Sequence, residues 1–237
     1  MQRDHCGKVA IIYDGGDYSQ GMSVLMSLIA GPQRIFSEDV RPNERPERYR
    51  RLAQSAKHRG ADCFVYMGAD NPNTFGIFEA FANALGEDAW LYGTDGVNQS
   101  SLKDDNGGLG TFASRVRLMA PPRDLGRYRA FEARFENAYN DAVPDPYVVY
   151  GFEAMRLALD AIRESGSGAR ADILEQLKST TERDSRLGTY SIDSSSGDTT
   201  LTDYDYLTFE GGRSNPRRAV PRDELKKSVA ALRQRKK

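Results

Sequence analysis

Residues 8–21 read KVAIIYDGGDYSQG, and this stretch decides the fold. The apolar run from Val9 to Tyr13 has the length and composition of a buried strand, and it stops at the glycine turn 14–17. A helical pattern opens at Tyr18, directly after this turn. A strand, a glycine turn and a helix start form the first half of a βαβ unit, in which ligands bind beyond the carboxyl end of the strand. The sequence therefore predicts a binding site at this turn.

The same pattern returns further along the chain. Short strand patterns occupy residues 33–36, 62–67 and 89–92, and helical patterns at 46–59 and 72–85 follow the first two of them. Strands that alternate with helices in this way are typical of a mainly parallel sheet with helices on both faces. We expect an α/β protein with a doubly wound parallel sheet and right-handed crossovers.

The second half of the chain is richer in helical patterns. A plausible strand at 111–118 leads away from the sheet, after a polar, glycine-rich segment at 100–110. Two strand patterns surround a turn at 193–198, and we expect them to pair as a hairpin. The expected helices and strands of this half are 124–140, 147–164, 169–178, 187–192 and 204–209.

Composition indicates a globular chain with a sizeable core. Of the 237 residues, 39% are hydrophobic and 28% are charged, and no stretch approaches the roughly 20 apolar residues of a membrane helix. Residues 1–7 lack the apolar centre of an export signal, so the chain as written is not addressed for secretion. From Arg213 onward, the sequence contains ten basic residues and only two acidic ones. We interpret this basic stretch as a solvated tail and expect no nucleic-acid partner.

The cysteines and histidines give no sign of a metal site or a cofactor. Cys63 lies inside a strand pattern, so we expect a buried hydrophobic residue there and no disulfide with Cys6. His5 and His58 have no ligand at metal-binding spacing around them. We expect no bound metal and no cofactor.

Catalytic motifs are also missing from the pattern. Residues 16–22 come near the spacing of a phosphate-binding loop, but Met22 stands where that loop needs a lysine. No Gly-x-Ser-x-Gly motif is present, and no histidine stands near a candidate nucleophile. The sequence indicates a binding protein and not an enzyme, with a nucleotide-dependent α/β enzyme as the less favoured interpretation.

Two acidic residues follow predicted strands and are candidates for ligand contact. Asp95 is flanked by glycines after the strand at 89–92, where it can receive a ligand's ammonium group, although an Asp-Gly turn needs no ligand. Asp70 follows the strand at 62–67 and either caps the next helix or faces the crevice. Asn71 and Pro72 are expected to open that helix, as its cap and its first residue.

Taken in order, these segments resemble the second half of a type I periplasmic solute-binding protein. The group that they are most similar to is the branched-chain amino acid (Leu/Ile/Val-binding) component of ABC transporters. The likeness extends over nearly all of the chain up to Gly212. The segments that carry it are 8–14, 18–21, 61–68, 93–96, 127–135, 150–162 and 188–198.

The resemblance implies a role for particular residues and a division of the chain. Two α/β lobes close on an amino acid in that family, so Tyr18 would contact the ligand, Ala69 and Asp70 would line the cleft, and Asp95 would pair with the α-ammonium group. The implied regions are a ligand-binding lobe at 1–116, a helical return segment of the other lobe at 117–186, strands completing the first region at 187–212, and a basic tail at 213–237.

The chain departs from the family in its extent. The family's first lobe would precede Lys8, so we expect either a shortened reading frame, an excised segment or a true half-receptor. The favoured function is an extracytoplasmic solute-binding protein that takes amino acids or similar small polar ligands to an ABC permease in the membrane. Without an export signal, a complete chain of this sequence would be cytoplasmic.

An alternative function belongs to a different class. The apolar face of the expected helix 147–164 lacks the sheet that it would normally cover, and exposed apolar faces favour association. The alternative is a ligand-sensing or interaction domain that pairs with another chain, or with itself, and takes no part in transport.

Overall fold

A computed structural model of the protein describes residues 6–97, 102–103, 108–120, 129–140, 146–201, 204–210 and 213–217. The described residues divide into two units. The first unit holds the described residues up to 120 and those from 205 to 217, and the second holds those from 129 to 204. Within the described residues, no helix has both the length and the apolar character that a bilayer crossing requires.

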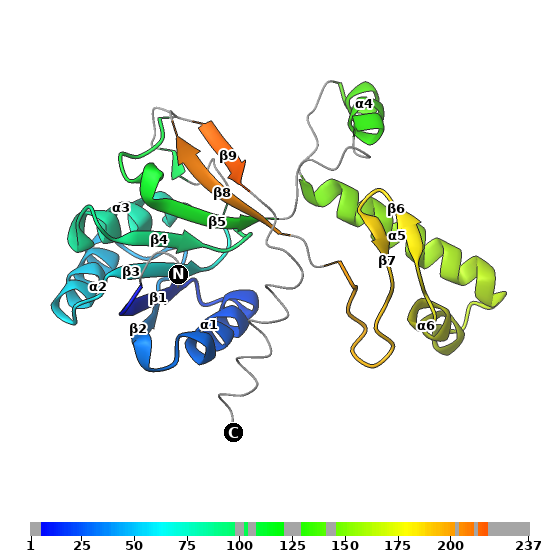
Figure 1. Ribbon diagram of the computed structural model, residues 1–237, viewed down its shortest axis with the longest axis horizontal. Coiled ribbons are helices and arrows are strands. Elements are labelled where there is room, and N and C mark those ends of the chain that lie inside the picture. The colour runs from blue at the N-terminus through cyan, green and yellow to red at the C-terminus, as the bar shows by residue number, and fades with distance from the viewer. Residues whose placement is uncertain are drawn as a thin grey trace. The chain divides into compact units, whose positions relative to one another are not determined.

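The first unit is built on a seven-stranded sheet of order β2-β1-β3-β4-β5-β8-β9 (Figure 1). The first five strands in this order pair in parallel, and β8 and β9 are added antiparallel. This confirms the expected α/β class with a mostly parallel sheet. The strands are β1 (Val9–Tyr13), β2 (Arg34–Asp39), β3 (Cys63–Met67), β4 (Trp90–Gly93), β5 (Val116–Ala120), β8 (Asp205–Glu210) and β9 (Arg213–Arg217).

Helices cover both faces of this sheet. Helices α2 (Pro46–His58) and α3 (Thr74–Leu85) lie side by side on one face, and α1 (Asp17–Ala30) packs on the other (Figure 1). The alternation of side chains along β1 follows from the period of two in a strand. Ala10 and Ile12 join the core under α2 and α3, whereas Val9 and Ile11 join the core under α1. Short 3-10 turns occupy Gly31–Gln33 and Ala113–Arg115.

The second unit contains three helices and a two-stranded antiparallel sheet among its described residues. These are α4 (Arg129–Ala138), α5 (Pro146–Ser165), α6 (Arg170–Lys178), β6 (Arg183–Ser185) and β7 (Gly188–Tyr190).

A buried ion pair fastens the strands of the second unit to α5. Glu153 is 2% exposed, and its Oε1 accepts hydrogen bonds from Arg183 Nε at 2.7 Å and from the Tyr190 hydroxyl at 3.2 Å. Arg183 Nη2 also donates to Asp160 Oδ2 at 2.8 Å. Because buried charges need ion-pair or hydrogen-bond partners, this network fixes the position of α5 relative to the β6–β7 hairpin.

The expected hairpin between residues 187–192 and 204–209 is wrong. β7 pairs with β6 across the two-residue turn 186–187, and it belongs to the second unit. Gly188, which follows the turn, has a φ of 108° that suits glycine. β8 instead pairs with β5 and brings Leu207 and Phe209 into the core of the first unit. The two strands therefore pair in different units, and residues 187–192 do not complete the first unit's sheet.

The predicted start of the basic tail at Arg213 is also wrong, because the first residues of that segment form a strand. Residues 213–217 form β9, which pairs with β8 in the register Phe209↔Ser214 and Leu207↔Pro216. Arginine, asparagine and proline are poor signals for a strand, but an edge strand tolerates them. The rest of the expected tail, 218–237, lies outside the described residues, as do 124–128 of the expected helix at 124–140 and most of the segment at 100–110.

The expectation of no disulfide is wrong as well. Cys6 and Cys63 form one, with their Cα atoms 5.7 Å apart and both side chains buried. Cys6 precedes β1 and Cys63 opens β3, and the parallel register aligns Val9 with Cys63. The Asp62 carboxylate holds the same corner, since it accepts hydrogen bonds from the backbone N–H groups of Gly7 and Lys8. Only the strand register, which the sequence does not display, brings the two sulfurs together.

We predict that reduction of this disulfide destabilises the first unit. A bond that closes a loop of 57 residues limits the unfolded chain and stabilises the fold by about 2–4 kcal/mol. Urea unfolding followed by circular dichroism should show this loss when reductant is added. The Cys6→Ser/Cys63→Ser double variant is the control and should not respond to reductant. Two free thiols in the denatured, unreduced protein would contradict the prediction.

Candidate functional site

Three loops meet at the carboxyl edge of the central strands. β1, β3 and β4 are neighbours in parallel register, with Tyr13 beside Met67 and Tyr66 beside Gly93. The loops that leave these strands, at residues 14–17, 68–73 and 94–97, therefore start side by side at one edge of the sheet, which we call the carboxyl edge. Binding sites of doubly wound folds lie at such edges.

Tyr18 and Asp95 are joined at this edge. The Tyr18 hydroxyl donates a hydrogen bond to Asp95 Oδ1 at 2.7 Å, across 77 positions of the chain. Tyr18 is the second residue of α1 and is 46% exposed, whereas Asp95 is half-buried. Two residues that the family resemblance assigned to the ligand site thus form one polar pair that is accessible from solvent.

Asp14 connects the first loop to the second. Its Oδ2 accepts a hydrogen bond from the backbone N–H of Ala69 at 2.9 Å, and its Oδ1 accepts one from Gly16 N–H at 3.0 Å. Gly15, between them, has a φ of 83°, which a side chain would disfavour. The sequence predictions gave Asp14 no individual role, so this structural contact was missed. An Asp before two glycines was the available signal, since aspartate side chains bond to nearby backbone in turns.

The second and third loops touch through their backbones. The Asp70 N–H donates to the Gly96 carbonyl at 2.8 Å, and the Thr94 hydroxyl donates to the Gly68 carbonyl at 2.9 Å. A Cβ on Gly96 would lie 2.7 Å from the Gly68 oxygen, which is closer than a real contact permits. Gly96 is therefore needed for the approach of these loops, independently of any ligand.

The Asn71 side chain forms hydrogen bonds within the second loop. It is not the cap of α3 that the sequence predicted. Helix α3 starts at Thr74, so Pro72 is not its first residue, and Asn71 instead accepts a hydrogen bond from Asn73 N–H at 2.9 Å. Its amide also donates to the Tyr66 hydroxyl at 2.7 Å. Burial, reinforced by the negative charge of Asp14, raises the pKa of Tyr66 to about 12. The tyrosine stays neutral and holds this hydrogen bond at any physiological pH.

The carboxyl edge thus presents acidic and hydroxyl groups on a braced backbone. Ala69 and Asp70 are exposed beside the Tyr18–Asp95 pair, at the end of a loop that Asp14 and Gly96 hold in place. Carboxylates on such a frame suit a cationic or hydrogen-bond-donating group of a small molecule. In the part of the chain that the structure describes, no cluster of three His, Cys, Asp or Glu side chains is placed to hold a metal ion.

Comparison with known proteins identifies relatives of this fold. The family described as "Periplasmic binding protein" matches residues 6–206. The leucine-binding protein LivK from Thermotoga maritima superposes with a TM-score of 0.74 at 18% identity, over 93% of this chain and 62% of that one. LivJ from Streptococcus pneumoniae, in complex with isoleucine, gives 0.67 at 16% identity, over 92% of this chain and 61% of that one.

A third solved structure carries a different type of ligand. A solute-binding protein of an ABC transporter from Rhodopseudomonas palustris HaA2, in complex with p-hydroxybenzoic acid, gives a TM-score of 0.71 at 20% identity, over 92% of this chain and 61% of that one. No curated protein sequence matches this chain. The chain spans about 62% of the length of the structures named first, so it corresponds to part of their fold.

We predict opposite effects from adding one methyl group at two glycines. Gly96→Ala should lower the free energy of unfolding by about 1–3 kcal/mol, because the new Cβ meets backbone atoms of Gly68 and Ala69. Gly21→Ala is the matched control. It lies inside α1 with no atom within 4 Å of the new Cβ, and it should stabilise by about 0.5–1 kcal/mol. Urea unfolding measures both, and a neutral Gly96→Ala variant would contradict the described loop contact.

Proposed function

This chain belongs to the periplasmic binding protein family, and from that premise we propose that it binds amino acids or similar small polar molecules for an ABC transporter. The observation that carries the proposal is the hydrogen bond of 2.7 Å between Tyr18 and Asp95 at the carboxyl edge. The function is binding and presentation of a solute, without catalysis.

Each nominated residue has a definite role in this proposal. Asp95 pairs with the ligand's ammonium group, and the Tyr18 hydroxyl keeps that carboxylate oriented while its ring forms one wall. Ala69 and Asp70 line the same edge from the neighbouring loop. The Asp14 brace holds this loop before the ligand arrives, so less order has to be gained on binding.

Compartment and partners follow from the same proposal. Disulfides persist in oxidising compartments, so the Cys6–Cys63 bond supports a periplasmic or other extracytoplasmic location. The acceptor of the solute is an ABC permease in the membrane. Because the named structures are longer than this chain, we propose that the remaining ligand contacts come from a second α/β lobe.

A specific feature of α5 favours a second candidate function, that of an interaction domain. Met155, Leu159 and Ile162 are 61%, 56% and 43% exposed and lie on one side of the helix. Such a stripe suits association with another chain. Sedimentation velocity tests this candidate: association that Leu159→Glu abolishes supports it, whereas a monomer at all concentrations contradicts it.

We predict that amino acids bind at the carboxyl edge and depend on Asp95. Titration of the isotopically labelled chain with leucine, isoleucine and p-hydroxybenzoate, followed by NMR, detects even weak binding. An amino acid should shift the amide signals of residues 14–18, 68–70 and 95–96. Asp95→Asn should weaken binding by about tenfold or more, because a charge-assisted hydrogen bond is lost.

The control is Asp172→Asn, which removes the same charge from α6 in the second unit and should leave the affinity unchanged. Shifts confined to other surfaces, or equal binding by Asp95→Asn, would contradict the proposed site. A preference for p-hydroxybenzoate over the amino acids would contradict the ammonium partner while keeping the edge as the site.

A further inference from the structure

We propose that the outward face of α2 binds an extended acidic peptide of a partner protein. A shallow hollow of about 590 Å³ lies on this face, and we call it the α2 groove. Hydrogen-bond donors line the groove, and no carboxylate does. The lining residues are Arg50, Arg51, Gln54, Ser55, His58 and Arg59.

The arginines of the α2 groove form no ion pair among the described residues. Among the described residues, no carboxylate lies within ion-pair distance of Arg50, Arg51 or Arg59. Arg48, on the same helix, shows the contrast, since it pairs with Asp39 and with Glu44 at 3.4 Å. Surface cations that lack an internal ion-pair partner attract an anionic ligand.

Arg59 is held in position at one end of the groove. Its Nη1 donates to the Ile35 carbonyl at 3.3 Å, and its guanidinium lies 5.5 Å from the centre of the Phe36 ring. A guanidinium fixed in this way loses little freedom when it binds a carboxylate. Arg59 therefore provides a prepared end point for an anionic segment.

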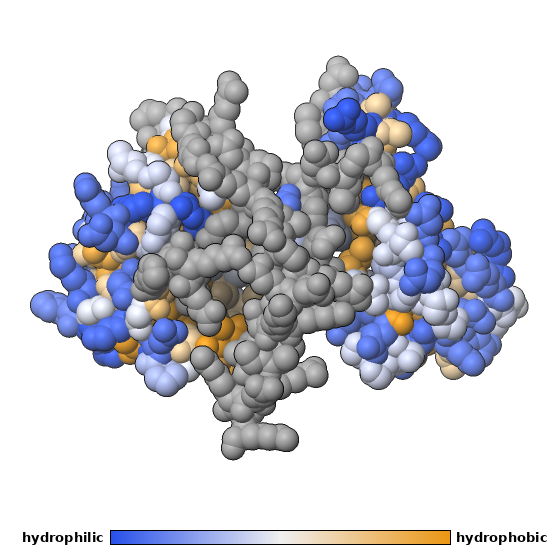
Figure 2. Space-filling model, viewed as in Figure 1, coloured by the Kyte–Doolittle hydropathy of each residue, from blue (hydrophilic) through white to orange (hydrophobic). Residues whose placement is uncertain are grey.

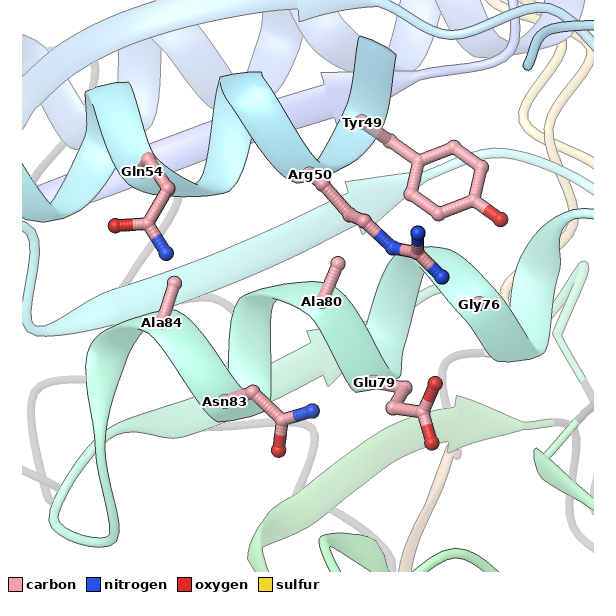
Figure 3. Close-up of a pocket in the computed structure, with 8 residues that line it drawn as sticks. All are labelled: Tyr49, Arg50, Gln54, Gly76, Glu79, Ala80, Asn83 and Ala84. Carbon is pink, nitrogen blue, oxygen red and sulfur yellow. The ribbon is translucent and has the colours of Figure 1, made fainter. Parts of the chain in front are cut away.

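The other end of the groove adjoins a second hollow, of about 290 Å³, between α2 and α3. Figure 3 shows Arg50 and Glu79 on the two facing helices, and Arg50 lines both hollows. Glu79 is an acidic boundary, because it lines the second hollow but not the α2 groove. An acidic ligand is thus directed along α2, from Arg50 toward Arg59, and away from α3.

The spacing of the donors favours a peptide over other anions. Residues four apart on a helix are separated by about 6 Å along its axis. Alternate side chains of an extended peptide are about 6.6 Å apart, which nearly matches. Carboxylates at every second position can therefore follow the row of Arg51, Ser55 and Arg59, and also the row of Arg50, Gln54 and His58.

Nucleic acid and membrane surfaces fit this face less well. The one tyrosine of α2, Tyr49, is 6% exposed, and no other aromatic residue of the Phe, Tyr or Trp type occurs in the helix to stack on bases. The exposed large hydrophobic residues that could enter a bilayer lie on other elements, and Figure 2 shows hydrophilic residues at the margin formed by α2.

The test measures binding of fluorescein-labelled peptides to the full chain by anisotropy at about 50 mM salt, where charge attraction is strong. The probes are a (Glu-Ser)6 peptide, a peptide of the same composition with its glutamates in one block, and a (Gln-Ser)6 peptide. The alternating acidic peptide should bind best. Arg51→Glu/Arg59→Glu should weaken it by on the order of tenfold or more, and Arg51→Gln by less.

Arg170→Glu is the control, because it reverses one charge on α6 in the second unit. It should leave peptide affinity unchanged, and circular dichroism verifies that all variants fold. Equal weakening by Arg170→Glu, equal binding of the block peptide, or tighter groove-dependent binding of phosphatidylglycerol vesicles or oligothymidine would each overturn the proposal.

Discussion

The parallel pairing of β1, β3 and β4 is the constraint on which the rest of this structure depends. Parallel strands end at the same edge, so three loops far apart in the sequence arrive within hydrogen-bond distance of each other. Once the loops meet, short polar contacts can specify their geometry, as Asp14 does with Ala69 and Asp70 does with Gly96. The Tyr18–Asp95 pair exists only because this pairing places α1 next to the loop after β4.

Sequence reasoning recovered the elements that carry a strong local pattern. The five residues of β3 are all buried, which explains why the continuous apolar run at 63–67 was recognisable as a central strand. The glycine turn after β1 and the acidic residue after β4 were found because single residues such as glycine and aspartate mark a turn. The ordered succession of these pieces was also enough to indicate the family, which the match to residues 6–206 confirms.

Several of the errors share one physical cause, because they concern which segments pair along the sheets. The disulfide depends on the register of β1 with β3, and the hairpin prediction failed because β7 pairs with β6 and β8 pairs with β5. Among the described strands, β9 is an edge strand that pairs only with β8, and its arginines and proline are weak sequence signals for a strand. The Asp14 brace was missed for the same reason, since its acceptor role depends on an N–H group 55 positions away. Whether Tyr18, Ala69, Asp70 and Asp95 hold a ligand remains a prediction.

The disulfide and the Asp14 contact, which hold the β1–β3 pair, affect the local opening of the first unit. The disulfide lies at the amino ends of the two strands and the Asp14 contact at their carboxyl ends, so the pair is clasped at both extremities. Local opening normally begins where a strand frays, and neither end here is free to do so. The amide hydrogens of this pair should be among the slowest in the unit to exchange with solvent. Peripheral strands can then fluctuate while the scaffold beneath the three loops keeps its dimensions.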